Sequence, residues 1–502
     1  MNGSNLVCVE RILQKLAQVR ARGLSCFGAE NHGFQLNPPA SEATLQDFEK
    51  AHHIRLPDDY RAFLAHAGNG GAGPYYGIYS LAGWNDFAGL VLDEIPDNFL
   101  ALPCPLHPEM PQTENWADGL GDVSPYQGTL TLGTQGCTYA MLLIVSGPSS
   151  GRVVYVDADG GAPYLVHHPD FLSWYERWLD ELLLGYASLW FGYGPGGGED
   201  DFFRILDDPQ ADDDFKVEAM QAFCRLPNLS ESASRRILEF QKHPLAGIRA
   251  GALAVVRTFK IHNTAEQTTM ALGDPSPNVR RQAIYGAVMG LDPARWTEAV
   301  LQRLHEDPDE DVAEAAFFKL KEAKALSKRE LLSIIEQSPS GKLRYLAAYE
   351  VKWDREDLSL LVRMLSDSHA MVRFYAMIGL RQIKARGTLP QILDLLSREH
   401  DNLVIGSILK MFGELHDPST APVLLKWAVS NDDFHRLDAV EALALIGDER
   451  AVPIAQAMLQ EDRPPQRHED GRSTQSNLHT IATLVSKALK ASPNPALRKL
   501  AH

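Results

Sequence analysis

Hydrophobic residues recur at a regular spacing between positions 215 and 447 of the chain. Each recurrence begins at a residue that we call the anchor, and consecutive anchors stand 29 to 33 residues apart. Further apolar residues follow each anchor at offsets of four and eight, which stay on one face of a helix. A period of this length indicates stacked structural units. The anchors are Phe215, Ile248, Val279, Val312, Leu343, Val372, Val404 and His435.

The residue four positions after the anchor is small in every unit but one, so a neighbouring helix can approach closely there. These residues are Ala219, Ala252, Ala283, Ala316, Ala347, Ala376, Ile408 and Ala439. Larger side chains, eight positions after most anchors, fill the layer between units: Phe223, Val256, Ala287, Leu320, Val351, Leu380, Phe412 and Leu443. A second amphipathic segment in each period predicts a unit of helix, turn and helix. Examples are residues 296–304, 358–365, 389–396 and 421–428.

Arginine directly follows five anchors, and proline, which marks the turn into a helix, stands four positions before four of the eight anchors. The arginines are Arg249, Arg280, Arg344, Arg373 and Arg436, and the prolines are Pro244, Pro275, Pro308 and Pro339. Such arginines can bind phosphates along a groove, or can pair with an acidic residue of the neighbouring turn. The candidate partners are Asp274, Asp307, Asp367 and Asp432. We favour pairing, because 43 Asp+Glu exceed 39 Lys+Arg from position 200 onward.

These units resemble the HEAT-like repeat family. The matching residues are Asp274-Pro275, Val279-Arg280 and Ala283, and later Ala442-Leu443 and Gly447-Asp448. The unit that starts at Val404 departs most, with Ile405 in place of the arginine and Ile408 in place of the alanine, so that unit is expected to pack differently. The resemblance implies a right-handed stack of helix pairs with a long exposed face that binds another macromolecule, and it implies no chemistry.

The first 190 residues have a different pattern, in which helical and strand periods mix. Ser41 caps a predicted helix, and Pro57 and Asp58 open another whose buried face carries Tyr60, Phe63 and Leu64. Glycines at positions 68, 70 and 71 end it. Residues 130–133, 140–145 and 151–157 alternate as strands do, and residues 171–184 form a closing amphipathic helix.

Residues 41–186 resemble the SUKH superfamily, which includes bacterial toxin-immunity proteins and fungal regulators of cell-wall synthesis. The resemblance rests on Phe48-Glu49, Ile54, Leu56-Pro57, Tyr60, Phe63-Leu64 and Asn69-Gly70-Gly71, followed by the strands and the closing helix. Gly136-Cys137 stands where the family usually shows paired glycines, so that turn is expected to differ. The predicted fold is therefore an α+β SUKH-like domain followed by an all-α HEAT-like solenoid.

Composition changes along the chain set the predicted boundaries. They are an N-terminal helix and lead-in at 1–40, the SUKH-like domain at 41–190, a glycine-rich acidic linker at 191–201, the repeat solenoid at 202–460, a polar loop at 461–475, and a capping helix with tail at 476–502. No apolar run approaches the ~20 residues that span a bilayer, and residues 1–22 lack the features of a secretory signal. We therefore expect a cytoplasmic protein without membrane insertion.

Charge is unevenly distributed along the chain, whose net charge is −17. Up to Glu199 there are 9 Lys+Arg against 22 Asp+Glu, so most of the excess lies in the predicted head. An acidic head repels phosphate backbones and attracts basic proteins. We therefore expect a basic protein partner and no nucleic acid, and the SUKH resemblance implies that this partner is a toxin domain. Solubility alone is the alternative explanation.

Residues 84–126 form a connection too long for a compact hairpin, and long ordered loops often recognise partners. The loop carries two tryptophans among many carboxylates, and aromatic anchors amid acidic residues suit a basic partner. The candidate partner-binding residues are Trp84, Asp86, Asp93, Glu94, Asp97 and Trp116, and the loop also holds Glu109, Glu114, Asp118 and Asp122. The alternative is that both tryptophans belong to the core and the carboxylates are merely solvated.

Candidate chemistry is sparse, and we expect no enzyme, cofactor or metal. Five scattered cysteines without a Cys-x-x-Cys pair suggest neither disulfides nor zinc, and adjacent histidines such as His52-His53 are poorly placed for one metal. The segment 157–160 starts like a calcium loop but lacks its later ligands. Acidic residues follow the glycines of 192–198, where a phosphate-binding loop needs Gly-Lys-Ser/Thr. A catalytic centre assembled only in three dimensions stays open.

The interpretation that unites these features is a non-enzymatic immunity protein that occludes the active site of a cognate toxin. A regulatory scaffold that bridges two protein clients is the first alternative, and a nucleic-acid-binding HEAT-like protein is the second.

Overall fold

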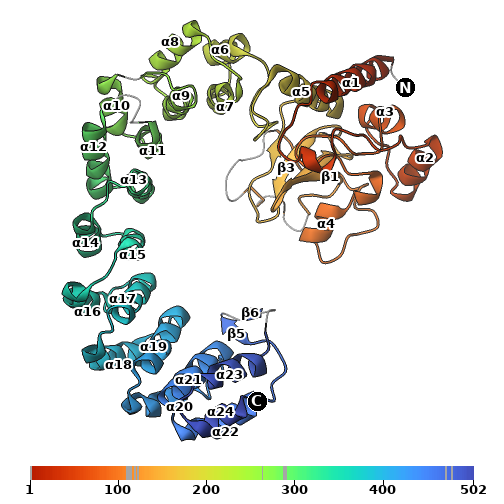
Figure 1. Ribbon diagram of the computed structural model, residues 1–502. Helices are drawn as coiled ribbons and strands as arrows, with labels where there is room; N and C mark the ends of the chain where they lie inside the picture. The colour runs from red at the N-terminus through yellow and green to blue at the C-terminus, as the bar shows by residue number, and fades with distance from the viewer. Residues whose placement is uncertain are drawn as a thin grey trace. The chain divides into compact units, whose positions relative to one another are not determined.

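The computed structural model describes residues 3–108, 116–117, 120, 124–262, 264–286, 291–469, 472–475 and 479–501. The chain divides into two compact units, Met1–Trp296 and Thr297–His502. The first unit holds an α+β head and the first helix pairs, and the second holds the later helix pairs (Figure 1). An α+β head followed by a HEAT-like helical array is the fold class that the sequence predicts, and the structure confirms it.

The head is a four-stranded antiparallel sheet with helices, and its strands pair in sequence order. Register shifts on either side of Gly133 and Thr134 mark irregularities in the pairing of β1 with β2. The head elements are α1 (Gly3–Ala21), η1 (Ala29–Asn31), α2 (Glu42–Ala51), α3 (Asp58–His66), η2 (Leu81–Gly83), α4 (Asp86–Val91), β1 (Thr129–Gly136), β2 (Tyr139–Ile144), β3 (Val153–Asp157), β4 (Tyr164–Leu165) and α5 (Phe171–Leu184).

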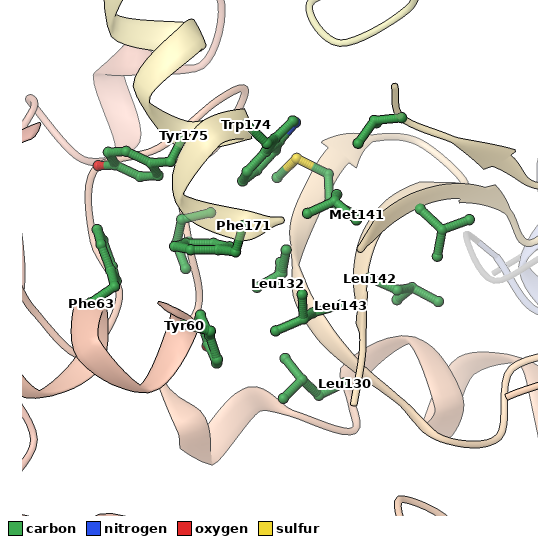
Figure 2. Close-up of a cluster of buried hydrophobic side chains, with 14 of the residues drawn as sticks. Tyr60, Phe63, Leu130, Leu132, Met141, Leu142, Leu143, Phe171, Trp174 and Tyr175 are labelled. Carbon is green, nitrogen blue, oxygen red and sulfur yellow. The ribbon is translucent and has the colours of Figure 1, made fainter. Parts of the chain in front are cut away.

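The core of the head lies between the sheet and helices α3 and α5. Figure 2 shows Phe171, Trp174 and Tyr175 of α5 together with Tyr60 and Phe63 of α3 and apolar residues of β1 and β2. All five aromatic side chains are at most 1% exposed. Their rings meet edge-on or tilted, as in the contact of Phe171 with Tyr60 at 4.8 Å between centroids, which is the arrangement that aromatic quadrupoles favour.

Two segments outside the predicted domain limits pack onto this core. Helix α1 lies beside α5 (Figure 1) and buries Val9, Ile12, Leu16 and Val19. The glycine-rich segment predicted as a linker buries Phe191, and Gly192 follows at φ 87°. A Cβ at that glycine would stand 2.1 Å from the hydroxyl of Tyr155, so a larger residue cannot fit. Both segments therefore belong to the packed head; the boundaries of the solenoid stay predictions.

The helices that carry the anchors, which we call the anchor helices, begin two residues before each anchor. They are α7 (Asp213–Ala222), α9 (Ala246–Thr258), α11 (Pro277–Gly286), α13 (Glu310–Glu322), α15 (Gly341–Glu350), α17 (Ala370–Gln382), α19 (Asn402–Leu415) and α21 (Asp433–Ile446). The other helices of the array are α6 (Glu199–Asp207), α8 (Glu231–Phe240), α10 (Ala265–Leu272), α12 (Pro293–Glu306), α14 (Lys328–Gln337), α16 (Leu358–Met364), α18 (Leu389–Arg398), α20 (Ala421–Trp427) and α22 (Val452–Met458). Single-turn helices η3 (Phe223–Arg225), η5 (Arg355–Asp357), η6 (Arg386–Thr388), η7 (Pro418–Thr420) and η8 (Glu449–Ala451) lie between them.

Burial along the anchor helices follows the predicted spacing of four and eight. Seven anchors are at most 3% exposed, and Phe215 is half-buried. All eight residues that stand four positions after an anchor are at most 2% exposed. Ile408 is one of them, so the unit that starts at Val404 is buried at this position like the others. Ala287, one of the residues eight positions after an anchor, lies outside the described residues. The predicted helix pairs are confirmed.

The C-terminal segment adds a hairpin and two helices. Strands β5 (Gln466–Glu469) and β6 (Arg472–Gln475) pair within the predicted polar loop, and α23 (Ile481–Lys490) and α24 (Pro495–Leu500) follow. Helix α23 packs on α21 and buries Ile481, Val485 and Leu489, which repeats the spacing of four and eight. The predicted start of this helix, at 476–478, lies outside the described residues.

Candidate functional site

The segment 84–97, which we call the acidic loop, carries five of the six predicted partner-binding residues. Asp86, Asp93, Glu94 and Asp97 are exposed, and Trp84 is half-buried. The backbone carbonyl of Trp84 accepts the N–H of Thr131 at 2.7 Å. This bond fixes the loop to strand β1, so a partner would meet a positioned surface.

A surface cavity of about 570 Å³ opens in the acidic loop, and the structure brings Trp84 and Asp97 together in its wall. The remaining lining residues are Ala51, His52, His53, Asn85, Ile95, Pro96 and Asn98. The ring of His52 contacts that of Trp84 at 4.6 Å between centroids. Burial lowers the pKa of His52, so this imidazole is neutral near pH 7. Asp86, Asp93 and Glu94 lie outside the lining of this cavity.

Trp116 is separate from this cavity. Its side chain is 6% exposed, its Nε1–H donates to the carbonyl of Gly160 at 3.3 Å, and its ring lies 6.3 Å from that of Tyr126. A side chain so deeply buried offers a partner little surface. Trp116 therefore fits the alternative interpretation, in which the tryptophan belongs to the core. Of the other carboxylates of the predicted loop, Glu109, Glu114, Asp118 and Asp122 lie outside the described residues.

A second pocket, of about 610 Å³, lies between the sheet of the head and helix α7; we call it the junction pocket. Its lining contains five aromatic residues and three charged ones, namely Tyr139, Tyr155, Tyr164, Trp190, Tyr193, Asp157, Glu218 and Arg225. Sequence reasoning missed it, because these residues come from three strands, the glycine-rich segment and the first helices of the array. The signal available in the sequence was Trp190, which directly precedes that glycine-rich segment, and Tyr193 within it.

Four of the five aromatic rings of the junction pocket form one connected cluster. Tyr193 is its centre, with ring centroids 4.9 Å from Tyr164, 5.1 Å from Tyr155 and 5.9 Å from Trp190. Burial raises the pKa of Tyr193 to about 12, so this phenol is neutral. Trp190 and Tyr139 are 58% and 41% exposed, which leaves ring surface open to a ligand.

Two carboxylates line the same pocket. Glu218 accepts the hydroxyl of Tyr164 at 3.2 Å and contacts Nε2 of His167. A hydrogen bond from the Thr138 side chain lowers the pKa of Asp157, so this carboxyl is ionised near pH 7. Its charge in turn raises the pKa of the Tyr139 phenol.

Arg225 is the cationic residue of the lining, and it is only 7% exposed. Its two Nη atoms donate to the carboxylate of Glu181, each at 2.9 Å. Its Nε has no hydrogen-bond partner among the described residues. The pocket thus combines aromatic faces and two carboxylates with an arginine that is already paired with Glu181.

Family models match one stretch in each part of the chain. Residues 39–177 match the SMI1 / KNR4 family (SUKH-1), and residues 389–470 match HEAT repeats. The chain carries a SUKH-1 domain followed by HEAT repeats. The acidic loop lies within the SUKH-1 domain, and the junction pocket joins strands of that domain to the first helices of the array.

Among curated proteins, Protein YibA of Escherichia coli strain K12 and that of strain O157:H7 are each 27% identical over 249 residues, which is 47% of this chain and 86% of theirs. The X-ray structure of E. coli YibA aligns at 23% identity with a TM-score of 0.36, over 50% of this chain and 93% of that one. Human deoxyhypusine hydroxylase in complex with glycerol aligns at 18% identity with a TM-score of 0.21, over 58% and 95%.

The repeat arginines connect successive turns of the array. Arg249 binds Asp274 through Nε and Nη2, each at 2.8 Å, and its Nη1 donates to the carbonyls of His243 and Pro244. Arg344 repeats this pattern with Asp367 and with the carbonyls of Ser338 and Pro339. The predicted pairing with Asp274 and Asp367 is therefore confirmed. The proline carbonyl accepts from the arginine in both units, and Arg373 makes the equivalent contact with the carbonyl of Ser368, so this contact does not require proline.

Other arginines use carboxylates that the sequence reasoning did not name. Arg373 pairs with Glu399, and Arg436 pairs with Asp433 and Glu461. Arg498 in α24 donates to the carbonyls of Ser492 and Pro493, which is the same loop contact beyond the predicted repeats.

Within the part of the chain that the structure describes, no group of three or more His, Cys, Asp or Glu side chains is arranged to hold a metal ion. Among the described helices, none combines the length and the hydropathy that crossing a membrane requires.

Proposed function

We propose that this chain is an immunity-type protein that neutralises a basic toxin, and that the acidic loop of its SUKH-1 domain covers the toxin's active site. The observation that carries the proposal is the acidic loop itself: four exposed carboxylates beside a half-buried tryptophan and a cavity. The loop belongs to the part of the chain with 9 Lys+Arg against 22 Asp+Glu. Complementary charge speeds the encounter of two proteins, and an aromatic anchor in a desolvated pocket holds them together.

In this mechanism the chain performs no catalysis and needs no cofactor. It acts by steric occlusion, and the HEAT repeats extend the contact area, because arrays of this kind present long exposed surfaces. A cytoplasmic location, where the chain would meet an incoming toxin, belongs to the same proposal.

The decisive growth experiment uses the neighbouring gene. If that gene encodes a toxin, its expression should arrest growth, and co-expression of this chain should restore growth. A toxic neighbour that kills equally well with and without this chain would contradict neutralisation of that toxin.

Neutralising the acidic loop should slow association with the toxin. We expect the variant Asp86→Asn, Asp93→Asn, Glu94→Gln and Asp97→Asn to lower the on-rate about ten-fold at low ionic strength, and less at high salt, because steering is screened. Stopped-flow mixing with the purified toxin domain over a salt series measures this effect.

A matched control variant removes the same charge elsewhere in the first unit, at Glu10, Glu30, Asp47 and Asp200, which are also exposed. It should keep most of the on-rate. An on-rate that is flat with salt, and equal in both variants, would contradict electrostatic recognition by the acidic loop.

The paired arginines also predict that nucleic acid is not the ligand. Arg249, Arg344 and Arg373 each bind a carboxylate through two nitrogens, so their charge is already offset. We expect filter binding with duplex and single-stranded nucleic acid to show no affinity tighter than about micromolar at physiological salt, the upper end of non-specific binding. Tighter binding with a steep salt slope would favour the nucleic-acid alternative.

A further inference from the structure

The junction pocket has no role in the proposed contact through the acidic loop, yet its lining is specific in chemistry. Rings of Tyr139, Tyr164, Trp190 and Tyr193 surround a space that also meets the carboxylates of Asp157 and Glu218. Its volume of about 610 Å³ is in the range of ligand sites. Aromatic faces attract cations through their quadrupoles, and carboxylates attract them by charge. The lining therefore favours a positively charged group.

The shape of the cation follows from the same residues. A guanidinium is flat, stacks on aromatic faces and donates from a planar fork to carboxylates, whereas an ammonium is a compact and strongly hydrated point charge. A pocket with several ring faces and two carboxylates suits the guanidinium better. Arginine is therefore the side chain that can contact both the aromatic rings and the carboxylates of this lining.

Arg225 does not cancel this preference. Its Nη atoms are bound to the carboxylate of Glu181, so its charge is already offset. The carboxylates of Asp157 and Glu218 then give the lining its acidic character.

We propose that the junction pocket receives an arginine side chain presented by the protein partner. This inference rests on the proposed function, in which the partner is a basic protein, and adds a second contact point outside the acidic loop. The arginine stacks between the exposed rings of Trp190 and Tyr139, and its guanidinium pairs with Asp157 and Glu218.

The test uses the full chain and short peptides, which need no identified partner. Acetyl-Gly-Arg-Gly-amide is titrated and followed by ligand-observed NMR, beside the same peptide with citrulline or lysine in place of arginine. Citrulline keeps the shape and removes the charge, so we expect its peptide to bind about ten-fold more weakly, and the lysine peptide a few-fold more weakly. Equal binding of all three peptides, or a preference for lysine, overturns the proposal.

Variants of the chain locate the binding. Asp157→Asn and Trp190→Ala change exposed or half-exposed groups, and each should weaken the arginine peptide about five-fold or more. Leu189→Ala, at an exposed apolar residue next to Trp190, and Asp97→Asn, in the acidic loop, are the controls and should leave the affinity unchanged. If the controls weaken binding as much as the pocket variants do, the peptide binds elsewhere and the proposal fails.

The outcomes also separate this inference from the proposed function. If the toxin binds and depends on the acidic loop, but the arginine peptide does not bind, only the junction-pocket inference fails. If free L-arginine binds more than about ten-fold more tightly than the peptide, the pocket is a small-molecule site and not a contact for a protein partner.

Discussion

Replacing Glu181 with alanine should destabilise the first unit by about 3–5 kcal/mol, the cost of removing one partner from a buried ion pair. Glu181 is 6% exposed and holds two buried arginines: Arg177 at 2.7 Å and Arg225 at 2.9 Å. Without the carboxylate, two guanidinium groups stay buried and uncompensated.

The hydrogen bonds of Arg177 and Arg225 extend the effect of Glu181 beyond helix α5. Arg177 also donates to the carbonyls of Gly194 and Pro195, so α5, the glycine-rich segment and η3 are joined through one carboxylate. Loss of Glu181 should therefore loosen the junction of the head with the first helix pairs, including the lining of the junction pocket.

Urea unfolding followed by tryptophan fluorescence measures the effect, because five of the eight tryptophans lie in the first 190 residues. The control is Arg235→Ala, which removes an exposed pair with Glu231 whose side chains are 72% and 89% exposed. That change should stay within about 0.5 kcal/mol. If Glu181→Ala costs no more than the control, the carboxylate does not compensate the two arginines.

Lowering the pH from 7 to 4.5 should reduce the stability of the first unit through His168, by about 2–3 kcal/mol. Burial, with help from the charge of Arg177, lowers the pKa of His168 to about 4, and its Nδ1 is buried without a partner among the described residues. Between pH 6.5 and 4 the unfolded chain binds a proton that the folded chain does not. Stability therefore falls as the pH falls through this window.

The variant His168→Gln cannot titrate, so its stability should change less between pH 7 and 4.5 than that of the natural chain, by the amount stated. Glu176 provides the contrast. The hydrogen bond from Arg11 lowers the pKa of Glu176 to about 2, so its stabilisation is present above pH 4.5 and is lost only as the pH falls toward 2. Glu176→Gln should therefore lower stability by a constant amount above about pH 4.5 and should change the slope of the curve only in that lower window. Parallel curves for the natural chain and His168→Gln would show that His168 is not held neutral.

The helical array could be predicted from sequence because its determinants are local and repeated. Spacings of four and eight identify one face of a helix, and a turn recurs at a fixed distance before each anchor. The turn residues could be recognised as well: Asp309, Ser340 and Asp432 cap their helices through backbone N–H groups of the next few residues. The partner of Arg373 could not be predicted, because Glu399 is brought to it by the packing of successive units.

For the candidate sites too, the sequence predicts what depends on local residues but not what depends on distant packing. The exposure of the carboxylates of the acidic loop follows from their charge, because an unpaired carboxylate is costly to bury. Trp84 and Trp116 have the same chemistry and similar neighbours in the sequence, yet one lines a cavity and the other is buried. Burial depends on which distant segments close over a side chain, and no local pattern records that.

The sequence by itself therefore determined the repeat, the helix faces, the acidic character of the head and the resemblance that places it in the SUKH superfamily, because each depends on residues close together in the chain. Tertiary structure alone decided that the glycine-rich segment packs on the head, that Glu181 joins two arginines, and that Tyr139, Asp157, Trp190 and Glu218 line one pocket. Those residues lie up to 79 positions apart, and only the burial of apolar surface between the sheet and α7 brings them together.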